Sequence, residues 1–546
     1  MSDHVIRPLV LVRGFGGNDI SDEQRNAYQG FNEGTVYPTR RGENFIYEGF
    51  VLRALKSDRY RYTDATNVVG YYPREVEPPD DQADWDSWDA ADLRGSVALD
   101  PWTARAVLRE AAPGTIWVYR FYDLSPRTMT TYGANLVRLI DLIGKAVRRQ
   151  GATFAGVDIV AHSMGGLVVR EALKALGSRK KALGLVHRVV TLGSPHRGIA
   201  FAGTPRFLLD TLPGFSKGSD EFAAFDPSRT DFLGIKKWFD PARVLTVVGT
   251  NYRTYNVGAV SGVNRLASLL EEGTLATNRS DGLVKQSAAQ LPGSPRTFVH
   301  KCHGGPDSLV TSREAYEIAM RFFHGSHHVR LWLDAARVTR GRDLFGKSEF
   351  WFGASIKPRG IDFELFHQSA EAENCYGPFN DEGLQGDGSY VEPELRKSFR
   401  DEGRTTGWLS AERLVWEGWN DEANVPDPAN PEMVFRLDLY LGERDSHGIG
   451  FSDNVVFRKQ YYVQVVLGDE LAIFVHTGEQ LLRRRDRPTP TDVADEADAD
   501  EKAGKDLRDR RVVRATRTDD GWTFPVQGTG FAATLRVGIT PVDLDG

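Results

Sequence analysis

One serine stands at the end of an apolar run, in "VDIVAHSMGGLVV" (Val157–Val169). The run is rich in β-branched residues, which favour a buried strand, and two glycines follow Ser163 after one residue. A serine held on a sharp strand-to-helix turn exposes its hydroxyl and can act as a nucleophile. The alternative is a serine that caps the following helix, because serine is a common N-cap residue. The strand before Ser163 and the amphipathic stretch after it favour the nucleophile.

A serine hydroxyl is a poor nucleophile at neutral pH, so it needs a nearby base and an acid that orients this base. Downstream, "NRSDGLV" places Asp281 in a polar loop, and "RTFVHKCHGG" places His303 in a glycine-rich loop after a predicted strand. The alternatives are His300 as the base and Asp307 or Asp123 as the acid. We predict a catalytic set of Ser163, Asp281 and His303, which follow one another in the chain order of the α/β-hydrolase architecture.

A glycine-rich loop near the start of the chain predicts an oxyanion hole. The stretch "LVLVRGFGG" runs from a predicted strand into Gly14 and the residues that follow. Glycines let a backbone approach a substrate closely, so the N–H of Phe15 can point at a carbonyl oxygen. With the N–H of Met164, at the start of the helix after the serine, it would form a pair of donors.

The elements that must position these residues alternate between strands and helices. Strands are expected at 9–13, 116–121, 157–161, 189–192, 244–248 and 297–300. Between them, "YGANLVRLIDLIGKAVRR" and "GGLVVREALKAL" repeat apolar residues at helical spacing. We therefore expect an α/β class domain with a mostly parallel sheet and helices on both faces. The helix "TSREAYEIAMRFFHG", with a predicted capping box at Thr311 and Glu314, closes this domain at residue 325.

After Gly325 the pattern changes to short alternating apolar segments separated by Gly, Pro, Asn and Asp. Such a pattern predicts an all-β sandwich over residues 326–546. Within it, residues 483–509 are highly charged with few large apolar residues, and we expect a mobile loop there. We expect residues 1–325 to hold the whole active site, and the sandwich to position the enzyme on a surface or partner.

Two insertions in the first domain are expected to act as a cap or lid over the active site. They span about residues 18–100 and 200–241. The second insertion has short apolar helical pieces, and four of its side chains would suit an acyl chain: Phe207, Leu208, Leu212 and Phe215. The alternative, that these residues only cover the core, is equally open.

Five segments in order resemble α/β-hydrolases of the bacterial lipase and esterase group, including lipase-like relatives of GPI-inositol deacylases. They are "VRGFGG", "AHSMGG", "TLGSPHRG", "SDGLV" and a histidine loop followed by "AYEIAMRFFHG", spread over about residues 5 to 325. The resemblance implies a serine ester hydrolase with Ser163 as nucleophile, Asp281 as acid and His303 as base. Two positions depart from the usual pattern: Arg13 stands where such lipases carry histidine, and Ala161 replaces the first glycine of the serine turn.

Composition narrows the class of protein further. The 546 residues carry a net charge of -7, which gives no reason to expect a nucleic acid partner. The two cysteines, Cys302 and Cys375, make neither a disulfide framework nor a zinc site, and we expect no metal or organic cofactor. No apolar run is long enough to span a bilayer, although a lipid substrate would bring peripheral membrane contact. The start of the chain lacks a signal-peptide pattern, so a cytoplasmic protein is expected, with signal-independent export as the alternative.

The sequence thus predicts a lipase-like or esterase-like hydrolase that works through an acyl-enzyme on an ester or lipid substrate. Two alternatives remain open. One is acyl transfer to an alcohol on the same three residues. The other is a binding or scaffold protein whose hydrolase domain is inactive.

Overall fold

The structure is a computed structural model of the 546-residue chain. It describes residues 6–14, 48–57, 59–60, 65–69, 98–99, 114–121, 128–198, 234–252, 280–304, 307–338, 348–367, 372, 374–380, 383–384, 413–421, 431–445, 454–468, 470–478 and 489–543. The chain folds as two compact units. The first contains residues 1–296 and 301–319, and the second contains residues 297–300 and nearly all residues from 320 onward.

An eight-stranded sheet with the order β3-β2-β4-β1-β5-β6-β7-β8 has all its strands except β8 in the first unit. The strands are β1 (Leu9–Val12), β2 (Ala65–Val69), β3 (Ala98–Leu99), β4 (Ile116–Arg120), β5 (Val157–His162), β6 (Val186–Leu192), β7 (Val244–Gly249) and β8 (Arg296–Val299). Parallel pairing joins β2, β4, β1, β5, β6 and β7, whereas β3 is antiparallel to β2. Every residue of β1, β5, β6 and β7 is buried, as expected of parallel strands covered on both faces.

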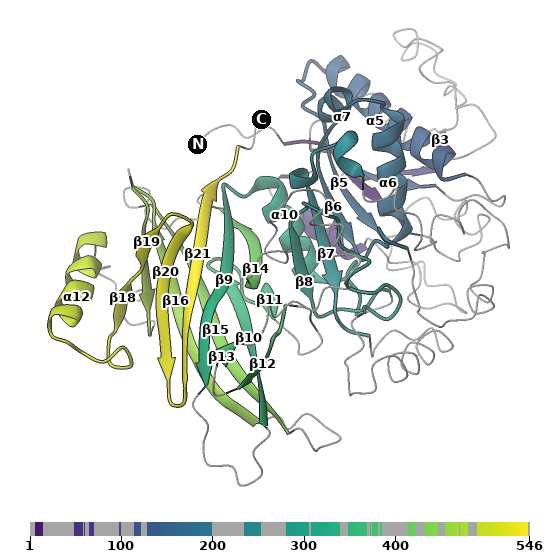
Figure 1. Cartoon of the computed structure of the whole chain (residues 1–546). Coiled ribbons are helices and arrows are strands. Elements are labelled where there is room, and N and C mark those ends of the chain that lie inside the picture. Colours follow the sequence, from purple (N-terminus) through teal and green to yellow (C-terminus); the bar gives the residue numbers. More distant parts are fainter. Residues whose placement is uncertain are drawn as a thin grey trace. The chain divides into compact units, whose positions relative to one another are not determined.

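Helices cover this sheet (Figure 1). They are α2 (Glu48–Leu55), α5 (Met129–Arg149), α6 (Met164–Ala175), α7 (Arg179–Leu185) and α10 (Arg313–His324), with short 3₁₀ turns at Ile235–Lys237 and Pro241–Arg243. In Figure 1, α5, α6 and α7 lie on one side of β5 and β6, and α10 lies on the other side. The α5–α6 contact is close because Gly133 lacks a side chain; a Cβ there would come within 2.7 Å of the Ala172 nitrogen. The predicted α/β class with helices on both faces is confirmed.

The sheet differs from expectation at one edge. The strands β2 and β3 extend it from within residues 18–100, which the sequence assigned to a cap insertion. The two strands are short, five and two residues, and their sequences ATNVV and AL carry little of the long apolar pattern of the central strands. Segments this short, with so few apolar residues, give no clear hydrophobic periodicity, and the sequence pattern therefore did not reveal them.

The second unit contains two antiparallel sheets. The larger has the order β13-β12-β10-β15-β16-β17-β18, with β11 paired to β10, and the smaller has the order β14-β9-β21-β20-β19. The strands are β9 (His327–Val338), β10 (Ser348–Pro358), β11 (Phe366–His367), β12 (Tyr376–Asn380), β13 (Gly383–Leu384), β14 (Arg413–Asn420), β15 (Glu432–Asp445), β16 (Asn454–Val466), β17 (Ala472–His476), β18 (Val512–Arg514), β19 (Thr516–Thr518), β20 (Gly521–Gly528) and β21 (Phe531–Pro541).

Aromatic contacts join the two sheets face to face. The ring of Phe531 on β21 lies 6.1 Å from that of Phe352 on β10 and 4.8 Å from that of Phe457 on β16. Trp416 on β14 contacts Phe435 on β15 in the same way, with ring centroids 6.0 Å apart. The inner faces of both sheets therefore share one apolar core, which confirms the predicted β-sandwich class.

The charged stretch 483–509 contains a helix where the sequence predicted a loop. The helix α12 (Pro490–Lys502) begins with a capping box in which Thr489 and Asp492 exchange hydrogen bonds. Its two buried apolar side chains, Val493 and Ala497, pack against Phe474 on the larger sheet. Charge density alone suggested disorder, but the cap and these two contacts are sufficient to hold a short acidic helix.

Candidate active site

Ser163 sits in a strained turn between β5 and α6. Its φ of 51° and ψ of -126° make it the one non-glycine residue with positive φ among those that the structure describes. Its side chain makes no capping hydrogen bond to α6, so the described contacts do not support the N-cap alternative. The turn fits because Gly165 lies against β1; a Cβ there would come within 2.6 Å of the Val12 carbonyl oxygen. Strain of this kind is stored where a side chain must be presented in a fixed direction.

His303 meets Ser163 from the loop after β8. Its Nε2 lies 2.9 Å from Ser163 Oγ, although 140 residues separate the two in sequence. Its backbone N–H donates to the Asp281 carbonyl oxygen at 2.8 Å, which fixes the loop against the acid. The alternative base, His300, has an exposed side chain.

Asp281 contacts the far side of the same imidazole. Its Oδ2 lies 2.8 Å from His303 Nδ1. Its Oδ1 accepts backbone N–H bonds from Leu283 at 3.0 Å and Val284 at 2.7 Å. A carboxylate can only accept, so Nδ1 carries the proton, and Nε2 of the neutral ring is free to accept from the serine hydroxyl. The alternative acid Asp307 pairs instead with Lys301 at 2.6 Å, and Asp123 lies outside the described residues.

The three side chains are buried together. Ser163 is 7% exposed, His303 3% and Asp281 1%. In such surroundings polar interactions are stronger than in water, because little solvent screens them. The arrangement can remove a proton from the serine hydroxyl and stabilise the imidazolium that results.

Two glycines that the sequence analysis did not single out make room for the acid. A Cβ on Gly193, after β6, would come within 2.7 Å of Asp281 Oδ2 and 3.3 Å of His303 Nδ1. A Cβ on Gly249, at the end of β7, would come within 2.6 Å of Asp281 Cβ. Gly193 also has a φ of +54°, which favours glycine. The sequence did contain one indication of their role. Each glycine directly follows a predicted parallel strand, at the edge of the sheet where the serine turn lies.

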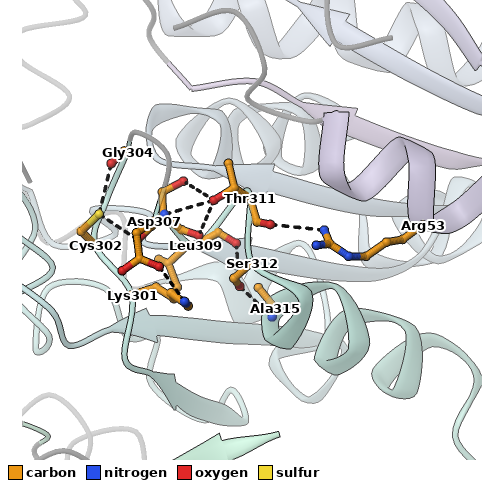
Figure 2. A network of polar contacts seen from close by, with 10 residues as sticks. Arg53, Lys301, Cys302, Gly304, Asp307, Leu309, Thr311, Ser312 and Ala315 are labelled. Carbon is orange, nitrogen blue, oxygen red and sulfur yellow. Dashed lines mark hydrogen bonds and ion pairs between the residues drawn. The ribbon is translucent and has the colours of Figure 1, made fainter. Parts of the chain in front are cut away.

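A polar network holds the segment that follows His303 (Figure 2). Cys302, which is buried, directs its Sγ at the carbonyl oxygens of Gly304 at 3.1 Å and Asp307 at 2.9 Å. Figure 2 also shows Arg53 of α2 donating to the Thr311 carbonyl oxygen at 3.2 Å. The start of α10 is capped by Ser312, whose Oγ accepts the Ala315 N–H at 3.0 Å. The predicted cap at Thr311 is therefore one residue too early, because the Thr311 hydroxyl bonds back to Ser308.

The predicted oxyanion donors and substrate contacts are described only in part. Met164 is buried at the first position of α6, directly after Ser163. Phe15 lies outside the described residues, and so do Phe207, Leu208, Leu212 and Phe215. Within the described ranges, no three His, Cys, Asp or Glu side chains gather in a group that could hold a metal ion. No described helix is long and apolar enough to cross a membrane.

Comparison with known proteins bears on the first unit. Residues 109–205 match the model of the family named PGAP1-like alpha/beta domain. In this range the chain is similar to a lipase-like α/β-hydrolase domain. The predicted resemblance is thereby confirmed, and the matched range contains the Ser163 turn with β5 and α6.

Solved structures resemble the chain more weakly, and no curated protein matches it. Phospholipase PlaB from Legionella pneumophila is 11% identical, over 63% of this chain and 84% of that chain, with a TM-score of 0.26. The same phospholipase in complex with thio-NAD is 12% identical, over 65% of this chain and 86% of that chain, with a TM-score of 0.27. Similarity this low has no bearing on the activity of the chain.

Proposed function

We propose that the protein is a serine carboxylic-ester hydrolase of the lipase or esterase type. One observation carries the proposal: Ser163 Oγ, the His303 imidazole and the Asp281 carboxylate form a continuous hydrogen-bonded chain at 2.9 and 2.8 Å. The strained backbone of Ser163 and the match to a PGAP1-like alpha/beta domain support it.

The mechanism follows from the roles that these three groups can take. His303 Nε2 accepts the hydroxyl proton as Ser163 Oγ attacks the ester carbonyl carbon. The N–H groups of Met164 and Phe15 would stabilise the oxyanion of the tetrahedral intermediate. His303 then gives the proton to the leaving alkoxide oxygen, and an acyl-enzyme remains on Ser163. A water molecule then attacks the acyl carbonyl carbon as His303 accepts its proton, and His303 returns this proton to Ser163 Oγ as the bond to the acyl group breaks and the acid leaves.

Asp281 would hold the imidazole in the tautomer that this sequence of steps requires. Its second oxygen is already occupied by two backbone N–H groups, so the carboxylate cannot easily turn away from the ring. No metal or organic cofactor enters the proposed reaction. An ester of lipid size would bring peripheral membrane contact, and acyl transfer to an alcohol would follow if water were excluded from the acyl-enzyme.

The test compares two serines that stand at helix starts. Ser163→Ala removes the proposed nucleophile, whereas Ser178→Ala removes a serine whose hydroxyl caps α7 by accepting the Lys181 N–H at 3.3 Å. We expect the first variant to lose at least about 1000-fold in turnover of a short p-nitrophenyl ester, and to lose labelling by a fluorophosphonate probe. The second should lose about 1 kcal/mol of stability and keep its activity.

A folded Ser163→Ala variant with unchanged turnover would contradict the proposal. Absence of both turnover and labelling in the native chain would instead favour a binding or scaffold protein. A chain-length series of p-nitrophenyl esters on the native chain would then define the preferred acyl group.

A further inference from the structure

His162, the residue directly before the serine, reaches across to the proposed base. Its Nε2 lies 2.9 Å from the backbone carbonyl oxygen of His303. The two imidazole rings lie 4.9 Å apart between centroids, tilted by 42°. His162 is 6% exposed, so this contact is shielded from solvent. The end of β5 therefore positions Ser163 through the backbone and contacts the proposed base through the side chain of His162.

The backbone of His303 is consequently held at both of its polar groups. Its N–H donates to the Asp281 carbonyl oxygen at 2.8 Å, and its carbonyl oxygen receives the His162 ring. The side chain is held at Nδ1 by the Asp281 carboxylate. The position of His303 Nε2 relative to Ser163 Oγ thus depends on contacts with Asp281 and with His162.

The chemistry of the contact sets the state of the His162 ring. A carbonyl oxygen only accepts, so His162 Nε2 carries a proton and donates it. The other ring nitrogen lies near Gly14, since a Cβ on that residue would come within 2.9 Å of His162 Nδ1. Burial, followed by the charge of His303 and then of Arg13, lowers the pKa of His162 to about 3. A neutral ring places no second positive charge beside the imidazolium that His303 forms during catalysis.

We propose that His162 is a positioning residue that holds the proposed base by donating from Nε2 to the His303 carbonyl oxygen. This inference rests on the proposed hydrolase function. Small displacements of a reacting group cost large factors in rate, and the group that fixes His303 therefore affects turnover without touching substrate.

The test uses three variants in the full chain. His162→Phe keeps a ring but cannot donate, and His162→Gln restores an N–H near the place of Nε2. His476→Phe is the matched control. His476 is also buried, and the substitution removes a comparable contact in the second unit, from His476 Nε2 to Gln464 Oε1 at 2.7 Å. The kcat and KM for a short p-nitrophenyl ester are measured below the unfolding temperature of each variant.

We expect His162→Phe to lower kcat by about 10- to 100-fold with KM changed by less than about three-fold. His162→Gln should recover most of this loss, and His476→Phe should keep the native kcat. Native kcat in folded His162→Phe, or equal losses in both His162 variants, would overturn the inference. A native chain that hydrolyses no ester would overturn the proposed function instead.

A second measurement needs no folded His162→Phe. Nitrogen NMR of the histidine-labelled native chain, with the His162 signal identified by its absence in His162→Gln, reports which ring nitrogen carries the proton. We expect the neutral form protonated at Nε2. A ring protonated only at Nδ1 cannot donate to the His303 carbonyl oxygen and would overturn the inference even if the ester assay failed.

Discussion

At the scale of single residues, the proposed chemistry assigns the base to His303 rather than to His300. His303 contacts both Ser163 and Asp281, while His300, three residues earlier, has an exposed side chain. His303→Ala should therefore reduce ester turnover nearly as much as Ser163→Ala, and the double variant should be no worse, because the two residues act as a unit. His300→Ala is the control and should retain activity. An inactive His300→Ala variant together with an active His303→Ala variant would show that the base is His300 and not His303.

At the scale of elements, the ends of parallel strands bring the acid to the base. The turn after β6 contributes Gly193, where a Cβ would collide with Asp281 Oδ2. Shortly after the end of α6, Gly177 also has positive φ, +71°, but a Cβ at that position would meet nothing within 4 Å. These two glycines share a positive φ and differ in what surrounds them.

That difference gives a matched pair of substitutions. Gly193→Ala and Gly177→Ala should both lose about 1 kcal/mol of stability from the strained backbone. Only Gly193→Ala should lower kcat for a short ester, by about 100-fold, because the added methyl group displaces Asp281 from His303. Equal kcat values in the two variants, measured at a temperature where both are folded, would show that the approach of Asp281 does not limit the reaction.

At the scale of the whole molecule, buried neutral histidines couple stability to pH. Burial lowers the pKa of His162 to about 3 and that of His476 to about 4, and burial also lowers the pKa of His187 and His196. In the unfolded chain these rings titrate near pH 6.5. Between that pH and the folded pKa values, the unfolded state binds more protons, so stability falls as the pH is lowered.

We therefore expect the thermal unfolding temperature to fall steadily from pH 7 to pH 5. Each buried histidine adds a slope that approaches ~1.4 kcal/mol per pH unit below its unfolded pKa. His476→Gln should make the dependence shallower without changing the proposed active site. An unfolding temperature that stays constant or rises over this range would contradict the sign of the effect.

The division into two units gives a further prediction at this scale. Ser163, Asp281 and His303 all belong to the first unit. A chain shortened to residues 1–325, which keeps α10 whole, should hydrolyse a small soluble ester, and it should lose activity on a membrane-presented one if the sandwich positions the enzyme. Size-exclusion chromatography must first show a single species. A monodisperse shortened chain without small-ester activity would mean that the sandwich contributes to the active site.

The sequence by itself determined the parts of this protein that depend on neighbouring residues. The apolar run before Ser163 and the glycines after it were sufficient to predict β5, the turn and α6, because strand and helix periodicities are local. The same local patterns predicted the change from an α/β unit to antiparallel sheets. They also favoured Asp281 and His303 over nearby alternatives, since each follows a predicted strand in the expected order.

Only the tertiary structure decided what lies together across long stretches of chain. No local pattern shows that Gly193 and Gly249 clear space for Asp281, or that His162 touches the carbonyl oxygen of a residue 141 positions away. The strand β2 and the acidic helix α12 were missed for a related reason. The residues of β2 favour no state strongly, and pairing with β4 stabilises the strand. The helix α12 has a local capping box, and packing of its two apolar side chains on Phe474 adds the contact that no local pattern shows.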